Sequence, residues 1–218
     1  MSDVKIDAKQ VKELREKSGA PMGDCLKALQ EAKGDMEEAF VVLRKRGIAS
    51  AAKKASRTTN EGAVGTYIHA GGKIGVLLEL NCESDFVART TDFQDLLKDI
   101  AMHIAAVDPR YVGKDEVTPA DIEKEKDVYR AQAAASGKPA NIIEKMLEGK
   151  MSKFYEEVCL LEQPFIKDQG VTIQQLISQK IAKLGENISI RRFARFKVGE
   201  PSYTVASAKA VATEEAAA

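Results

Sequence analysis

The feature that most constrains the fold is one stretch of strand-like alternation in a chain that otherwise repeats with helical spacing. Smaller or polar residues alternate with Val64, Thr66 and Ile68, and apolar side chains recur at every second position from Ile74 to Leu80. Residues 70–73 between the two segments contain two glycines. This pattern predicts two half-buried strands joined as an antiparallel hairpin. Residues 188–196 predict one further strand, and a slip in the alternation at 191–192 indicates a bulge or a loss of burial there. We therefore expect an α+β fold in which helices pack on a small antiparallel sheet.

Three short helices are predicted before this sheet, and together they form a module at residues 1–47. Asp7 and Asp35 are suitable N-caps for the first and third helices. Gly34 and Gly47 follow the last apolar positions of the second and third helices, which is where helices commonly end. The positions at helical spacing that we expect to face the module interior are Ala8, Val11, Leu14, Met22, Cys25, Leu26, Leu29, Ala39, Phe40 and Leu43.

The remaining chain divides into a linker, a core domain and a tail. Residues 48–60 are rich in Ala, Lys, Ser and Thr and predict a basic linker, with helix extending at most to Lys54. The core domain is expected at residues 61–200. The Ala-rich residues 201–218 have nothing to pack and predict a flexible tail.

A projecting helical hairpin is predicted inside the core domain, at about residues 118–149. Its first helix is charged and Ala-rich and has few large apolar residues, so it is expected to be only partly buried. A break at residues 136–139 then turns the chain back into a second helix. Two further helices are predicted at 151–161 and 172–184.

Composition and charge exclude several classes of protein. Apolar residues make up 44% of the 218 residues and charged residues 30%, which is typical of a soluble globular protein. Lys plus Arg equals Asp plus Glu at 33 each, so the chain lacks the excess charge that would attract nucleic acid or an anionic membrane non-specifically. No apolar run has the length of a signal peptide or membrane span. We expect a cytosolic protein.

No catalytic site, metal site or cofactor is predicted. The Gly-Lys dipeptides lack the flanking residues of a P-loop, and no GxGxxG motif occurs. The two histidines, His69 and His103, lie outside any metal-ligand motif and are expected to be structural. The three cysteines are far apart, which favours small buried side chains over a disulfide or a zinc site. A glycosidase-like carboxylate pair stays open, because 33 acidic residues offer many pairs.

A basic cluster between Arg44 and Arg57 gives an alternative function. Six Lys and Arg residues occur there without an acid, so the cluster could contact phosphates or an acidic protein surface. Proteins that bind single strands usually interleave aromatic residues for base stacking, and none lies between Phe40 and Tyr67. A solvated helix end is therefore the preferred interpretation and no direct nucleic-acid contact is expected, while a non-enzymatic RNA- or ribosome-binding protein is the alternative.

Residues 81–87 (NCESDFV) lie where an apolar strand ends and a helix is about to begin. Phe86 stands there beside Asp85, and side chains at the end of an element are poorly covered by neighbours. We name residues 84–87 the candidate wedge, because an exposed aromatic side chain at this place can enter a partner. Packing of Phe86 in the core is the alternative.

Residues 91–93 (TDF) have similar letters but predict a different role. Thr91 and Gln94 are spaced as a capping box at the start of an amphipathic helix. Phe93 is the first residue of an apolar stripe that continues to Ala105. Phe93 is therefore expected to be a core residue.

The order of these parts and several motifs resemble the elongation factor Ts family. The matching segments are residues 11–15 (VKELR), 18–25 (SGAPMGDC), 79–88 (ELNCESDFVA), 104–106 (IAA), 163–165 (QPF), 185–188 (GENI) and 191–192 (RR). The match runs from the first helix to about Gly199, and the three-helix module is similar to the ubiquitin-associated-type domain of that family.

The resemblance implies a translation elongation factor that promotes guanine-nucleotide exchange on elongation factor Tu and has no active site of its own. It also implies a protein of the bacterial cytoplasm or of an organellar stroma or matrix. In the family, a Thr/Ser-Asp-Phe motif enters the nucleotide domain of the GTPase and displaces elements that hold Mg²⁺ and the phosphates. This motif corresponds here to Ser84, Asp85 and Phe86, followed by Val87.

The resemblance also implies a second contact and a homodimer. The contact that the family's helical module makes with the GTPase corresponds here to Arg15 and Met22, while Gly23 stands where some members have a second Met. Long members of the family have two core subdomains, whereas only one set of core motifs is present in this chain. The second half of the surface is therefore expected to come from another copy, in a complex of two chains with two GTPases.

Overall fold

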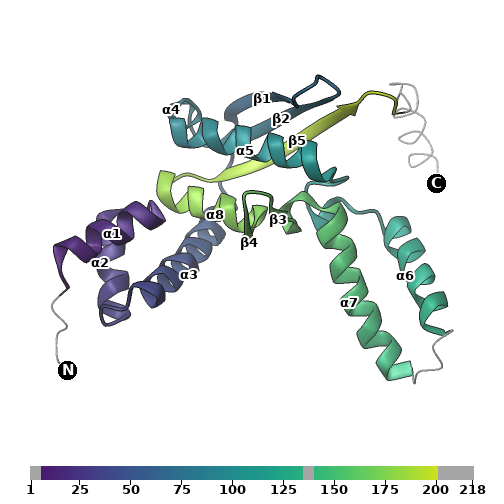
Figure 1. Cartoon of the computed structure of the whole chain (residues 1–218), viewed down its shortest axis with the longest axis horizontal. Helices are drawn as coiled ribbons and strands as arrows, with labels where there is room; N and C mark the ends of the chain where they lie inside the picture. The colour runs from purple at the N-terminus through teal and green to yellow at the C-terminus, as the bar shows by residue number, and fades with distance from the viewer. Residues whose placement is uncertain (1–5, 135–139, 201–218) are drawn as a thin grey trace.

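The structure is a computed structural model that describes residues 6–134 and 140–200. These residues form the predicted α+β fold, with a three-helix module at one end, a sheet-containing core in the middle and a helical hairpin at the other end (Figure 1). The α-helices are α1 (Ala8–Ser18), α2 (Met22–Glu31), α3 (Met36–Lys54), α4 (Asp85–Ala88), α5 (Thr91–Val107), α6 (Pro119–Ala134), α7 (Ala140–Val158) and α8 (Ile173–Leu184). The strands are β1 (Glu61–Ile68), β2 (Ile74–Cys82), β3 (Pro164–Phe165), β4 (Asp168–Thr172) and β5 (Ile188–Lys197), and two 3₁₀ turns are η1 (Lys114–Glu116) and η2 (Leu160–Glu162).

The main sheet is antiparallel and has the strand order β1-β2-β5. β1 and β2 form the predicted hairpin, and β5 is the predicted late strand. Glu79 pairs with Arg192, but the next residue, Leu80, pairs with Ile190, so Arg191 is the extra residue of a β-bulge. The irregularity predicted at this point of the sequence is thus confirmed as a bulge.

One face of the sheet packs on α5 and α8 and forms the main core. Phe93 is fully buried there, as predicted. β1 approaches α5 closely at Gly65, since a Cβ at this position would lie 2.6 Å from Cγ of Leu97. The predicted N-cap of α5 is wrong by one residue: Thr90 has the extended backbone of a cap, and its hydroxyl accepts from the N–H of Phe93 at 3.3 Å, whereas Thr91 is already helical.

The predicted caps of the three-helix module are confirmed, but the predicted end of its third helix is wrong. Asp7 and Asp35 accept hydrogen bonds from the first turns of α1 and α3. α3 continues past Gly47 to Lys54, so only the last part of residues 48–60 connects helix and sheet. Gly47 is buried, and a Cβ there would lie 3.6 Å from Cβ of Ala182 on α8. The glycine therefore lies in a close helix–helix contact and not at a helix end.

Four of the side chains expected in the module interior are instead exposed: Ala8, Met22, Leu26 and Phe40. Leu26 and Phe40 are 40% and 41% exposed. The module is small, and its interior is filled by residues such as Leu14, Cys25 and Leu29, which are fully or almost fully buried. Helical spacing alone does not distinguish the centre of an apolar stripe from its edge.

The helical hairpin projects from the core as α6 and α7 (Figure 1). Thr118 caps α6, because its hydroxyl accepts from the N–H of Asp121 at 3.1 Å. The predicted break at 136–139 lies outside the described residues, as does the predicted tail at 201–218. The separate helix predicted at 151–161 is wrong: α7 runs without interruption to Val158. An isolated glycine, here Gly149, costs a helix only about 1 kcal/mol, and packing of the following residues compensates for it.

Candidate partner-binding site

The candidate wedge contains the single turn of α4, directly after β2 (Figure 1). Phe86 is 78% exposed, the largest value among the large exposed hydrophobic side chains of the described residues. Core packing, the alternative for Phe86, is therefore wrong. Phe93, in the similar segment at 91–93, is fully buried, so the two phenylalanines have opposite environments.

The backbone of α4 is fixed at its N-cap. Ser84 is the N-cap, and its hydroxyl accepts from the N–H of Val87 at 3.4 Å. The carboxylate of Glu186 accepts two hydrogen bonds from Ser84, one from the N–H at 2.9 Å and one from the hydroxyl at 2.6 Å. Asp85 forms an ion pair with Arg89 at 2.8 Å, in the first turn of the helix where a negative charge is favourable.

The single turn of α4 has an inner and an outer side. Ala88 is buried, and Val87 is half-buried against the main core. Phe86 projects outward, next to the half-exposed carboxylate of Asp85. Of the four residues in the candidate wedge, Phe86 therefore presents the largest apolar surface to a partner.

The second predicted contact lies on the three-helix module. Met22 is the first residue of α2 and is 50% exposed. A Cβ added at Gly23 would have open space around it, so the second methionine of some family members would also face solvent here. Arg15 is an exposed residue in the last turn of α1. Leu26 extends this exposed apolar surface along α2, which spacing alone did not reveal.

The two predicted contact regions lie at the same end of the molecule, with α1, α2 and α4 on the left in Figure 1. α3 leads from the module onto α8 of the core, and its residues Gly47 and Ala51 are buried. Arg44 of α3 also donates to the carbonyl of Gly170 at 3.5 Å and to the side chain of Gln175. The module is thus packed on the core through a continuous helix.

Comparison with known proteins decides the family. The family model described as Elongation factor TS matches residues 7–200. The chain belongs to the elongation factor Ts family. Similar proteins named Elongation factor Ts include that of Koribacter versatilis (strain Ellin345), 67% identical over 213 residues that cover 98% of this chain and 97% of the relative. That of Solibacter usitatus (strain Ellin6076) is 64% identical over 195 residues, covering 89% and 92%. The chain is thus a translation elongation factor.

Three of the six cations in the basic cluster of this elongation factor Ts chain bind other parts of the chain. Arg46 forms an ion pair with Glu31 at 2.6 Å, and Arg57 forms one with Glu83 at 3.4 Å. Arg44 bonds to α8 and the β4 region, as described above. A cation that already has a protein partner contributes less to a phosphate-binding surface. These contacts favour a structural role for the cluster over the RNA-binding alternative.

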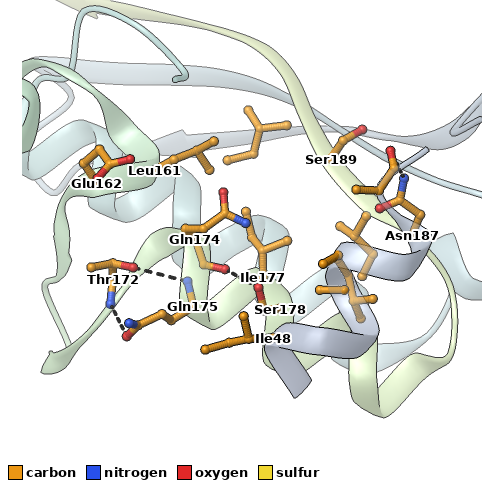
Figure 2. A pocket seen from close by; sticks show the side chains of 16 residues that line it. Ile48, Leu161, Glu162, Thr172, Gln174, Gln175, Ile177, Ser178, Asn187 and Ser189 are labelled. Carbon is orange, nitrogen blue, oxygen red and sulfur yellow. Dashed lines mark hydrogen bonds between the residues drawn. The ribbon is translucent and has the colours of Figure 1, made fainter. Parts of the chain in front are cut away.

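A groove of about 600 Å³ lies between α3, α8 and β5 of the core (Figure 2). Its walls include Ile48 and Ile177, together with the capping pair Thr172 and Gln175, whose reciprocal hydrogen bonds Figure 2 shows. Glu162 is the one carboxylate among the residues that line this groove, and it forms an ion pair with Lys114 at 2.9 Å. The groove therefore offers no pair of facing carboxylates for acid–base chemistry.

The histidine and cysteine side chains of the core have structural environments. His103 is buried and hydrogen-bonds to Gln163 at 3.0 Å, and burial lowers the pKa of its imidazole. The three cysteines are free and buried, and burial raises the pKa of Cys159 to about 11. Within residues 6–134 and 140–200, no three His, Cys, Asp or Glu side chains are grouped as metal ligands, and no helix there is long and apolar enough to cross a membrane.

Proposed function

We propose that this chain binds elongation factor Tu and promotes the release of GDP by inserting Phe86 near the Mg²⁺ and phosphate site of the GTPase. The observation that supports this role is the exposure of Phe86 on a helical turn whose N-cap, Ser84, is held by Glu186. The similar proteins come from bacteria, and we place this activity in the bacterial cytosol.

Insertion of Phe86 needs no bond chemistry in the chain itself. Mg²⁺ requires near-ideal octahedral coordination. A bulky apolar side chain that shifts the elements supporting the ion therefore weakens the binding of Mg²⁺ and of the phosphates that Mg²⁺ holds. Asp85 accompanies Phe86 as its polar neighbour. In this proposal Ser84 and Val87 fix the turn, while Phe86 carries most of the effect.

Met22 supplies a second contact to the nucleotide domain of the GTPase, together with Arg15. The half-exposed Met22 at the start of α2 supports this assignment, since flexible apolar side chains are effective in protein contacts. Gly23 contributes no side chain to the contact. Met22 and Arg15 then form a binding contact that is separate from the candidate wedge.

A stopped-flow measurement of labelled GDP leaving elongation factor Tu tests the proposal. Phe86→Ala is expected to lower the stimulated rate roughly tenfold or more, as removal of a central aromatic contact does at many interfaces. Val107→Ala is the matched control. Val107 is a 40% exposed apolar residue at the C-terminal end of α5, whereas α4 precedes the N-terminal end of α5. An unchanged rate with Phe86→Ala would show that the assignment of the wedge is wrong.

The chain acts as a homodimer that forms a two-to-two complex. The outer face of the sheet supports this, because it is apolar and uncovered: Val64, Ile68, Leu77 and Phe196 are 67%, 65%, 45% and 66% exposed. Contiguous apolar patches of this kind mark protein interfaces. Sedimentation equilibrium at micromolar concentration is expected to give a dimer, and Leu77→Lys a monomer. A monomeric unmodified chain would contradict the homodimer while leaving the role of Phe86 open to its own test.

A further inference from the structure

Glu186 lies far from the candidate wedge in sequence but in direct contact with it in space. It follows Gly185, which has a left-handed backbone with φ 82° and ends α8. Both oxygens of its carboxylate accept hydrogen bonds from Ser84, at 2.9 Å from the N–H and at 2.6 Å from the hydroxyl. Hydrogen bonds to a charged acceptor are among the stronger ones in proteins. We name this pair of bonds the Ser84–Glu186 anchor.

α4 is too short to be stable alone, so contacts with the rest of the chain hold it at both ends. Ala88 is buried in the main core and its carbonyl accepts from the side chain of Gln94 at 2.7 Å, while the anchor holds Ser84 at the other end. α4 has four residues, whereas isolated helices shorter than about 12 residues are marginal in water. The hydrogen bond from the N–H of Val87 to the hydroxyl of Ser84 is long, at 3.4 Å. Phe86 is 78% exposed and gains little orientation from contacts of its own. Its direction is therefore set by the backbone that the anchor helps to fix.

The turn at residues 186–187, which contains Glu186, also bonds to the segment that follows α3. Asn187 is buried, and its N–H donates to the carboxylate of Glu83 at 2.6 Å. The side-chain amide of Asn187 donates to the carbonyl of Arg57 at 2.9 Å. Arg57 in turn contacts Glu83 at 3.4 Å. The turn at 186–187 therefore joins the candidate wedge to the connection from the three-helix module.

We propose that Glu186 is the positioning residue of the exchange site, which holds α4 so that Phe86 points outward before any partner arrives. This inference rests on the proposed function of Phe86 for its effect on exchange, but the positioning itself is measurable in the free chain. Pre-orientation lowers the cost of ordering Phe86 as it is inserted into a GTPase that is already bound through Met22. Loss of the anchor should therefore lower the rate of exchange in the complex more than the affinity of the complex.

The first experiment measures the mobility of position 86 without any partner. The chain contains no tryptophan, so Phe86→Trp creates a single fluorescent reporter. Adding Glu186→Ala is expected to lower the fluorescence anisotropy of this reporter, and adding Glu186→Gln to keep most of it, because an amide can still accept from the N–H of Ser84. Asp99→Ala is the matched control. It removes a partly buried carboxylate of α5, which pairs with Lys167 at 2.7 Å. Equal anisotropy in the Glu186→Ala and control variants would overturn the proposal.

The second experiment is a double-mutant cycle on the stimulated release of GDP from elongation factor Tu. Glu186→Ala is expected to lower the maximal rate on the order of tenfold, the effect of losing a charged hydrogen-bonding pair. The concentration at half-maximal rate should change less than about twofold, and Glu186→Gln should restore most of the rate. In a Phe86→Ala background, Glu186→Ala should have little further effect, since it acts through Phe86.

The outcomes separate this inference from the proposed function. If Phe86→Ala slows release but Glu186→Ala does not, Glu186 is not a positioning residue, while the role of Phe86 stands. If the effects of the two substitutions multiply, Glu186 acts on something other than Phe86, and the inference is wrong. If Glu186→Ala does not fold, Ser84→Ala removes the hydroxyl bond of the anchor from the other side, and an unchanged anisotropy and rate would then overturn the inference.

Discussion

Phe86 and Phe93 each follow an aspartate and lie close together in the chain, but the backbone exposes the first side chain and buries the second. Phe86 is in the single turn of α4 and points to solvent, while Phe93 is in the first turn of α5 and is fully buried. The difference follows from the elements on either side. The helix that begins at Thr91 carries a long apolar stripe that must face the sheet, whereas α4 contributes only Val87 and Ala88 to the interior.

Stability measurements should separate the roles of the two phenylalanines. Phe93→Ala leaves a cavity in the main core and is expected to lower the free energy of unfolding by about 3–5 kcal/mol. Phe86→Ala removes an exposed side chain and should change the same quantity by about 0.5 kcal/mol or less. Urea denaturation of the two variants checks this. A large loss of stability with Phe86→Ala would mean that its effect on exchange cannot be assigned to the partner contact.

His103 should make stability fall as the pH drops below about 6.5, the ordinary pKa of an imidazole. Burial lowers the pKa of its imidazole in the folded chain, so the unfolded chain binds the proton more readily. The contribution of neutral His103 is then fully present above its ordinary pKa of about 6.5 and is lost as pH falls through the lower folded pKa. Urea denaturation at pH 7.5 and 5.5 measures the decline. The decline should be smaller in His103→Gln, while His69→Gln, which changes an exposed histidine, should retain it.

At the scale of elements, α3 determines how the three-helix module is attached. The glycine at position 47 suggested the end of a helix, because glycine commonly follows a helix C-terminus. The helix continues because Gly47 and Ala51 are small enough for α3 to lie close to α8. This contact brings together residues that are far apart in sequence, and so it could not be predicted from local pattern.

Substitutions at Gly47 should have effects of opposite sign. Gly47→Ala adds a Cβ at an ordinary contact distance of 3.6 Å from Ala182 and improves helix propensity, so it should raise the free energy of unfolding by up to about 1 kcal/mol. Gly47→Leu should separate α3 from α8 and lower the same quantity by about 1–3 kcal/mol. Thermal and urea denaturation check both. A stabilised Gly47→Leu variant would contradict the close contact of the two helices.

Local signals were sufficient for the three strands of the main sheet, most helices and the exposed position of Phe86, since these depend on periodicity, caps and the ends of elements. They were not sufficient for three features that arise from packing between distant residues. The continuous α7 needed the apolar contacts of its second half, which include Phe154 and Val158. The short pair β3–β4 has too few residues for a pattern. The bonds from Ser84 to Glu186 join segments with no periodic relation.

At the scale of the whole molecule, the candidate wedge and the three-helix module with Arg15 and Met22 lie at one end, while the hairpin of α6 and α7 projects at the other (Figure 1). Two separate contacts on one chain, as proposed for Phe86 and Met22, favour binding, because the second contact forms after the first has already restricted the partner. α3 and the turn at 186–187 connect the two regions. The arrangement therefore suits a factor that must stay bound while it disturbs a ligand site.

Thermodynamic linkage gives a prediction for the complete complex. If the chain weakens the affinity of elongation factor Tu for GDP, then GDP must weaken the affinity of elongation factor Tu for the chain by the same factor, typically about 5–150-fold. Calorimetric titration of the chain into nucleotide-free and GDP-bound elongation factor Tu measures this ratio. Phe86→Ala should bring the two affinities closer together, because it removes the contact that is proposed to compete with Mg²⁺ and phosphate binding. Met22→Ala should instead weaken both affinities to a similar degree, since the contact proposed for Met22 is separate from that of Phe86. Equal affinities of the unmodified chain for the two forms would contradict a role in exchange.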